Sequence, residues 1–247
     1  MVGAERVGVI VPAAGAGRRL GTQAGKALVL LASRPLLAWA VAGVEANDRV
    51  DSVVVVAHPA TLHTVTELLG AHGSAKVAAV VPGGPTRRTS VAAGLAALPP
   101  APGYVAVHDA CRPLLAPGAI DRLTETLLAL GCHGVAPGAQ VTDTVRRVAG
   151  GGRSAGIVDR EALRALQTPQ VFVRVVLEEA HRRAAAGGLG AGPGVTDEAT
   201  DAVLVERAGF PVAVVPGEPE NLTVTTPLDL EVAEVLLSRR ARGQVAR

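Results

Sequence analysis

The chain has 247 residues, a length typical of one α/β domain. Hydrophobic residues make up 49% of it but aromatic residues only 2%, so the core must be built mainly from Val, Leu and Ala. The net charge of +2, without a basic block, argues against a nucleic-acid partner. No apolar run reaches the roughly 18 residues of a membrane span, and Cys111 and Cys132 indicate reduced thiols. We therefore expect a cytoplasmic protein whose partners include neither nucleic acid nor membrane.

Short apolar runs that do not alternate with polar residues predict strands buried on both faces of a parallel sheet. These runs are residues 7–11, 53–57, 77–81 and 104–107. Helical patterns follow them at residues 35–46, 60–69, 89–98 and 117–130. The alternation of strand and helix predicts a doubly wound α/β sandwich with right-handed crossovers.

The pattern changes after Val135. Two short β segments around Gly150–Gly152 predict a hairpin arm at about residues 138–160. Beyond it we expect helices near residues 173–186 and 196–207, a strand at 212–215, and a last helix with Thr226 as its N-cap and Pro227 in its first turn. No linker or repeat divides the chain, so residues 1–247 are expected to form a single domain that carries the arm.

A loop of small residues, 12–26, follows the first predicted strand. Its backbone N–H groups, at the carboxyl end of a parallel strand, are able to approach phosphates closely. The loop also carries the cations Arg18, Arg19 and Lys26, which suit a triphosphate whose charge rises in a transition state. A glycine turn with solvated surface cations stays open as the alternative.

Two common phosphate-binding motifs do not explain this loop. Gly15 and Gly17 begin like a dinucleotide-binding motif, but Leu20 stands where the third glycine belongs. Lys26 is followed by Ala27 rather than by Ser or Thr, which excludes a Walker-type loop.

Two more polar segments follow apolar runs. In residues 83–91, glycines permit close approach to a base or ribose, and Ser90 is either a nucleotide ligand or a helix cap. In residues 108–113, Asp109 is suited to hold Mg²⁺ against phosphates while Arg112 binds another phosphate. An ion pair between these two side chains that merely closes a loop is the alternative.

Together these motifs resemble the 2-C-methyl-D-erythritol 4-phosphate cytidylyltransferase family of the non-mevalonate isoprenoid pathway. The resemblance covers nearly the whole chain, and the number, order and spacing of the motifs make it specific. The matching segments are 13–19 with Lys26, 83–91, 108–113, Asp143-Thr144, Asp159-Arg160, 168–170 and 196–199.

The resemblance implies a Rossmann-like, mostly parallel sheet of the GT-A-like kind and a single nucleotidyltransferase domain with a projecting β-hairpin arm. It implies a Mg²⁺-dependent transfer of the cytidylyl group from CTP to the methylerythritol phosphate. It also implies a homodimer whose arms cross, so that Thr144 and Arg160 serve the partner's site. The implied residues are Arg19, Lys26 and Arg160 for catalysis, Ala13, Ala14, Gly15, Gly17, Gly83, Gly84 and Ser90 for the nucleotide, Asp109, Arg112, Thr144, Thr168 and Thr223 for the polyol phosphate, and Asp109 for the metal.

The chain departs from the family pattern near the C-terminus, and also at Gly25 and Ala27, which flank Lys26 where proline and a polar residue are common. Where the family usually has a lysine in Asn-x-Lys-hydrophobic-Thr, this chain has Thr223. A ribitol-5-phosphate or other polyol-phosphate cytidylyltransferase therefore stays open, as does a non-catalytic nucleotide-binding protein. Taken singly, Arg160 is also consistent with a surface charge, Thr168 with a turn, and Thr144 with an ordinary strand residue.

Overall fold

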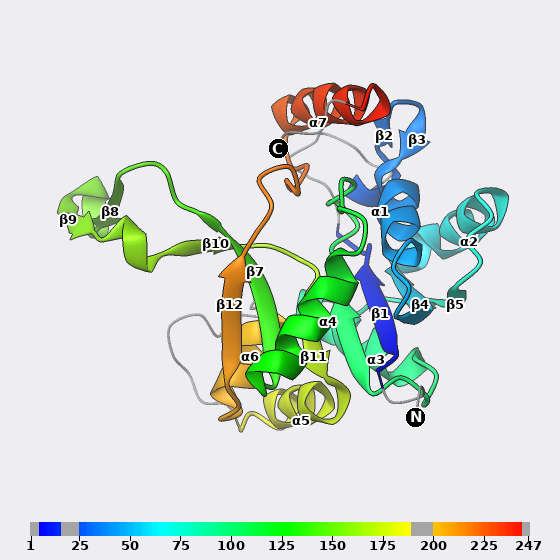
Figure 1. Ribbon diagram of the computed structural model, residues 1–247, viewed down its shortest axis with the longest axis horizontal. Coiled ribbons are helices and arrows are strands. Elements are labelled where there is room, and N and C mark those ends of the chain that lie inside the picture. The colour runs from blue at the N-terminus through cyan, green and yellow to red at the C-terminus, as the bar shows by residue number, and fades with distance from the viewer. Residues whose placement is uncertain (1–4, 16–24, 189–199, 244–247) are drawn as a thin grey trace.

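The computed structural model describes residues 5–15, 25–188 and 200–243. An eight-stranded sheet forms its centre, with the order β10-β7-β11-β6-β1-β4-β5 and with β12 paired to β7 (Figure 1). The strands are β1 (Val7–Pro12), β4 (Val50–Ala57), β5 (Val77–Pro82), β6 (Tyr104–Val107), β7 (Gly134–Gln140), β10 (Arg164–Leu166), β11 (Gln170–Val173) and β12 (Val212–Pro216).

Most of the sheet is parallel, as the apolar runs predict. β1 pairs in parallel with both β4 and β6, and β4 with β5. β11 is antiparallel to β6 and β7, and β10 is antiparallel to β7. The four strands predicted from apolar runs and the strand at 212–215 are confirmed, whereas β7, β10 and β11 were not predicted.

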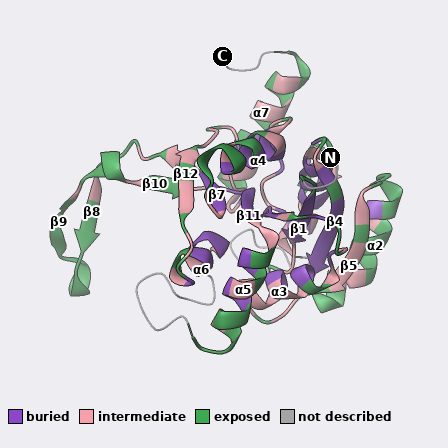
Figure 2. Ribbon diagram, turned by 60° about the horizontal axis from the view of Figure 1, so that its bottom comes forward, coloured by how far each residue is buried: buried purple, intermediate pink, exposed green. Residues whose placement is uncertain are grey.

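Helices cover both faces of the sheet, which confirms the doubly wound arrangement. Side chains of β1 alternate between two cores: Val9 and Val11 lie in one, and Ile10 lies in the other. The first core is covered by α1 (Leu36–Glu45), α2 (Leu62–Ala71) and α4 (Ala119–Leu130). The second is covered by α3 (Arg87–Ala97), α5 (Arg174–Ala185) and α6 (Asp201–Arg207). Figure 2 colours the buried residues of these strands and helices purple.

α3 packs very closely on the sheet. A Cβ atom at Gly94 would lie 2.5 Å from Ile10 Cγ2 and 3.0 Å from Val56 Cγ2, so no side chain fits there. Thr86 caps the helix in a reciprocal arrangement with Thr89. The interpretation of Ser90 as the helix cap is therefore wrong, because the N-cap lies four residues earlier.

A hairpin of β8 (Val145–Val148) and β9 (Ser154–Val158) turns at Gly150–Gly152 and stands off the sheet at the left of Figure 1. At the other end, α7 (Pro227–Ala241) begins at the predicted cap, Thr226. It packs near the small sheet of β2 (Leu30–Leu31) and β3 (Arg34–Pro35). Among the described helices, none has the length and apolar character needed to cross a membrane.

Candidate active site

The carboxyl ends of the parallel strands bring the three predicted polar segments to one edge of the sheet. The Ala13 amide donates to the Val56 carbonyl at 2.8 Å, and the Gly83 amide donates to the Ala57 carbonyl at 2.8 Å. On the other side of β1, the amide of Ala110 approaches the Pro12 carbonyl at 3.4 Å. Ligands of open α/β sheets bind at this edge.

Two of these segments touch through a glycine. A Cβ at Gly83 would lie 2.8 Å from Ala14 Cβ and 2.9 Å from Ser90 Oγ, while one at Gly84 would overlap the Thr89 side chain. The Ser90 hydroxyl is buried below this contact and donates to the Thr86 carbonyl at 2.9 Å. The lack of side chains at Gly83 and Gly84 therefore lets the Ala14 segment and the start of α3 pack directly against this loop.

Lys26 begins a short 3-10 turn, Lys26–Leu28, beside this surface, and its amide approaches the Gly15 carbonyl at 3.5 Å. Burial raises the pKa of the Cys111 thiol to about 11, while the charge and hydrogen bond of Lys26 act in the opposite direction. The ammonium group thus lies against the 108–113 loop. A cavity of about 150 Å³ nearby is lined by Ala13, Gly15 and Gly25 together with His58 and other residues.

Three sequence-based assignments fall on parts of the chain that the structure does not describe. Arg19, Gly17 and the segment 196–199 lie outside the described residues.

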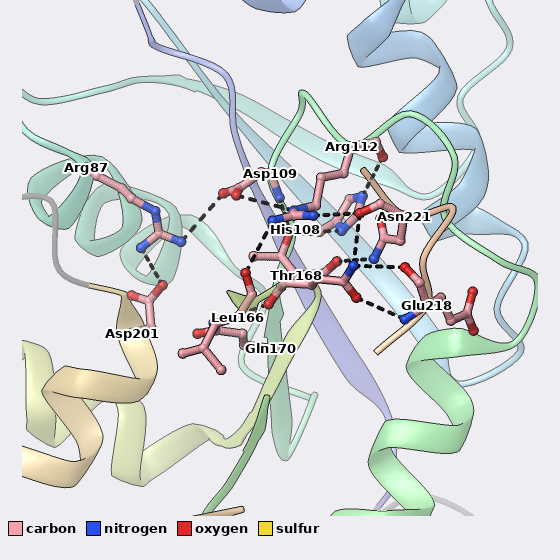
Figure 3. A network of polar contacts seen from close by, with 11 residues as sticks. Arg87, His108, Asp109, Arg112, Leu166, Thr168, Gln170, Asp201, Glu218 and Asn221 are labelled. Carbon is pink, nitrogen blue, oxygen red and sulfur yellow. Dashed lines mark hydrogen bonds and ion pairs between the residues drawn. The ribbon is translucent and has the colours of Figure 1, made fainter. Parts of the chain in front are cut away.

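Asp109 sits at the end of β6 with its carboxylate partly open to solvent. The exposed fraction of its side chain is 33%. Arg87 NH2 lies 3.6 Å from Asp109 Oδ1, and Arg112 Nε lies 3.9 Å from Asp109 Oδ2 (Figure 3). Both are ion pairs longer than a hydrogen bond. The ion pair between Asp109 and Arg112 that the sequence left open as an alternative is thus formed. It is longer than a hydrogen bond, and the Asp109 carboxylate remains accessible to solvent.

Arg112 is largely buried and is engaged with main-chain carbonyl groups. Its NH1 donates to Asn221 O at 2.6 Å, and its NH2 donates to Leu166 O at 3.4 Å. Burial lowers the pKa of this guanidinium. Arg112 therefore joins two distant segments of the chain to the Asp109 loop, and its contact with a substrate phosphate stays a prediction.

Thr168 and Thr223 flank the same loop. The Asp109 amide donates to Thr168 Oγ1 at 3.0 Å, and the Val224 amide donates to the Cys111 carbonyl at 2.9 Å. The second bond places the neighbouring Thr223, which is half-buried, beside the loop. Both residues thus lie beside the Asp109 loop, and their contact with the acceptor stays a prediction.

The arm residues lie apart from this cluster within one chain. Thr144 and Arg160 are exposed and flank the two arm strands. Arg160 donates to the Thr142 carbonyl and pairs with Glu161 at 3.7 Å. A role for them in substrate binding is therefore not visible within a single protomer.

Comparison with known proteins agrees with the arrangement of these motifs. The sequence profile of the 2-C-methyl-D-erythritol 4-phosphate cytidylyltransferase family matches residues 7–239. The chain belongs to this family. Proteins of that name from Streptomyces coelicolor and Nocardia farcinica are 43% and 44% identical to it, over 95% and 94% of this chain and 86% and 94% of theirs. The crystal structure of the Thermus thermophilus protein of the same name has a TM-score of 0.71 at 34% identity, covering 94% of this chain and 99% of that one.

In this family member, sequence reasoning missed the ionic group behind Asp109. Arg87 NH1 bonds to Asp201 Oδ2 at 2.7 Å, and Asp201 is fully buried. The sequence did carry a signal: Arg87 is part of the 83–91 motif, and a second Thr-Asp pair, Thr200-Asp201, follows the matched segment 196–199. The structure shows that α6 begins at Asp201, whereas the prediction of a helix over 196–207 put this residue inside the helix.

His108 is also buried in this family member, in a polar chain that fixes the Asp109 loop (Figure 3). Its Nε2 lies 3.1 Å from the Arg112 carbonyl, and its Nδ1 lies 3.4 Å from Thr168 Oγ1. Because a carbonyl only accepts, Nε2 carries the proton and Nδ1 accepts from the threonine hydroxyl. Burial lowers the pKa of His108 to about 4, so the ring is neutral at pH 7.

Acid is expected to destabilise the fold through this histidine. The folded pKa of about 4 lies below the ordinary value of 6.5, so between these values the unfolded chain binds the extra proton and stability is lost as the pH falls. Each pKa unit is worth about 1.4 kcal/mol, which predicts a loss of about 3 kcal/mol from His108 on going from neutral pH to pH 4. Urea unfolding across this range measures the loss, and His108→Gln, which keeps a donor but does not titrate, should show a visibly flatter pH dependence. An equal slope in both proteins would contradict the assignment.

Proposed function

We propose that this protein transfers the cytidylyl group of CTP to 2-C-methyl-D-erythritol 4-phosphate and releases pyrophosphate. The relatives from Streptomyces coelicolor and Nocardia farcinica carry the name of that activity. The observation that carries the proposal is the meeting of Ala14, Gly83 and Ser90 at the same sheet edge as Asp109 and the Lys26 turn. This geometry offers main-chain atoms to a nucleotide on one side of β1 and charged groups on the other.

The chemistry requires alignment and charge neutralisation more than covalent participation by the protein. An oxygen of the acceptor phosphate attacks the α-phosphorus, forming one O–P bond while the bond to the leaving pyrophosphate breaks. The attacking oxygen is already anionic, so no base is needed to remove a proton from it. Lys26, with Arg19, would neutralise the charge that builds up on the triphosphate.

Asp109 fits a role in holding Mg²⁺. The described residues contain no group of three or more His, Cys, Asp or Glu side chains able to hold a metal. Mg²⁺ is commonly held by one or two carboxylates together with substrate phosphates, and the partly exposed Asp109 matches that pattern. The ion would supply charge neutralisation at the phosphates.

The proposal includes a homodimer assembled through the arm, and a cytoplasmic location. Val148 and Ile157 on the two arm strands are 65% and 69% exposed. Large exposed apolar side chains on a projecting hairpin suit burial against a second copy. In this assembly Thr144 and Arg160 would reach the acceptor in the partner's site.

The identity of the acceptor depends on Thr223, which stands where the family usually has a lysine. A ribitol-phosphate acceptor is the second candidate, and Thr223 is the observation that favours it. To separate the candidates, purified protein is incubated with Mg²⁺, each nucleoside triphosphate and each polyol phosphate in turn. The measured quantity is the rate of pyrophosphate release. Equal or faster turnover with ribitol phosphate displaces the first. Tight CTP binding without any turnover identifies a binding protein instead.

Introducing the missing cation is expected to improve acceptor binding. Thr223→Lys should lower the KM for the methylerythritol phosphate about fivefold to tenfold, the effect of one added charge-assisted hydrogen bond of about 1 kcal/mol. Thr223→Gln, which adds length without charge, is the control and should leave the KM near its original value. An unchanged or higher KM for the lysine variant would show that a cation at this position does not limit binding.

A further inference from the structure

Arg87 lies between two carboxylates that differ in burial (Figure 3). Its NH1 is 2.7 Å from Oδ2 of the fully buried Asp201, and its NH2 is 3.6 Å from Oδ1 of Asp109, whose side chain is 33% exposed. Only the first distance is that of a hydrogen bond. The guanidinium is therefore bonded to the buried carboxylate and merely close to the one that faces the site.

Asp201 is fixed from both sides. Its Oδ2 receives the bond from Arg87, and its Oδ1 accepts a bond of 2.9 Å from Nε2 of the buried His181 on α5. Burial works against the charge of Asp201, but Arg87 and then His181 outweigh it, and the pKa is lowered to about 2. The carboxylate is thus ionised, and within the described part of the chain each of its oxygens has one hydrogen-bond partner.

This arrangement determines how strongly Arg87 engages Asp109. A guanidinium that forms two parallel hydrogen bonds with a carboxylate occupies the oxygens that a cation would otherwise contact. The present separation of 3.6 Å between Arg87 NH2 and Asp109 Oδ1 exceeds hydrogen-bond distance by less than about 1 Å. The bond to Asp201 holds the guanidinium short of that position.

We propose that Asp201, supported by His181, is a positioning residue that holds Arg87 back from Asp109 and so keeps the Asp109 carboxylate open to a phosphate-bound cation. Asp201 acts through Arg87 and is itself buried away from the substrates. The nature of the cation and substrates rests on the proposed function, but the Arg87–Asp109 geometry is independent of it.

The Asp201→Asn variant tests the proposal by structure and by kinetics. In its crystal structure, Arg87 should form two hydrogen bonds to Asp109 in place of the 3.6 Å ion pair. The half-saturating Mg²⁺ concentration should rise about tenfold or more, while kcat at saturating Mg²⁺ changes less than about threefold, because the effect is competition for one carboxylate. The CTP dissociation constant without Mg²⁺ serves as the control and should stay within about twofold.

Two further comparisons separate positioning from general damage. Asp201→Asn combined with Arg87→Gln should regain most of the Mg²⁺ affinity, because no cation remains to close on Asp109. His181→Leu should shift the Mg²⁺ dependence in the same direction as Asp201→Asn, whereas His181→Gln keeps a donor and should resemble the wild type. If Asp201→Asn fails to fold, the comparison of His181→Leu with His181→Gln tests the proposal instead.

The proposal is overturned if Arg87 remains at its present distance from Asp109 in the variant, or if the double variant is as impaired as the single one. Absence of turnover by the wild-type protein would contradict the proposed function instead. The crystallographic distance would still decide the inference in that case.

Discussion

Replacing Lys26 with methionine is expected to lower kcat about 100- to 1,000-fold, the usual effect of removing one donor that stabilises transition-state charge. The ammonium lies at the edge where β1 ends and influences the Cys111 thiol of the Asp109 loop. From there it can reach anionic oxygens that gain charge during displacement. Because this charge develops mainly in the transition state, kcat should fall more than the KM for CTP rises.

The chain offers a matched control, since Lys76 is its only other lysine. Lys76 precedes β5, donates to the Asn47 carbonyl at 2.9 Å and lies at the opposite end of the strand from Gly83. Lys76→Met should retain kcat within about twofold, the result expected for a cation outside the site. A Lys26→Met enzyme with more than about a tenth of the wild-type kcat would rule out the charge-stabilising role.

Replacing Arg160 with alanine is expected to abolish most turnover and to be rescued by a partner chain. Arg160 is exposed and contacts only arm residues among its described hydrogen bonds and ion pairs. If it serves the partner's site, a heterodimer of Arg160→Ala and Lys26→Met chains contains one intact site and one doubly damaged site. Random assembly of the two variants should therefore restore about a quarter of the wild-type activity.

Co-expression of the two variants with different affinity tags measures this rescue directly. Arg153→Ala, which changes an exposed arginine beyond the arm's turn, is the control and should keep near wild-type activity. A mixture as inactive as its parents would place Arg160 in the site of its own chain or outside catalysis.

The sequence predicted the parallel half of the sheet well because burial on both faces leaves an unmistakable apolar run. Val7–Pro12 and Val50–Ala57 are examples. Val77–Pro82 was also found from its apolar run, but the expectation of burial on both faces is wrong for it, because it lies at the edge of the sheet and its side chains are only partly covered. β7 escaped prediction because Pro137 and Gly138, both poor strand formers, interrupt it. Gln170–Val173 is short, and its antiparallel direction depends on pairing with strands far away in the sequence. Such tertiary pairing has no local signal.

The candidate site was predicted through its residue types and positions but not through its internal bonds. Asp109 lies at a strand end, as expected, and Gly83 makes a close backbone approach. The hydrogen-bond partners of Arg87 and Arg112, by contrast, come from residues more than fifty positions away. Asp201 becomes buried only when α6 packs against α5 and its carboxylate meets Arg87 on α3, so the repeated Thr-Asp pair alone did not identify it.

The most direct test of direct cytidylyl transfer is a single-turnover reaction with CTP, Mg²⁺ and 2-C-methyl-D-erythritol 4-phosphate. The masses of the products and of the protein are measured by mass spectrometry. Direct attack by the acceptor phosphate predicts one CDP-linked product and one pyrophosphate for each CTP consumed, with the mass of the protein unchanged throughout. Pyrophosphate without the CDP-linked product, or a protein carrying a cytidylyl group, would contradict it.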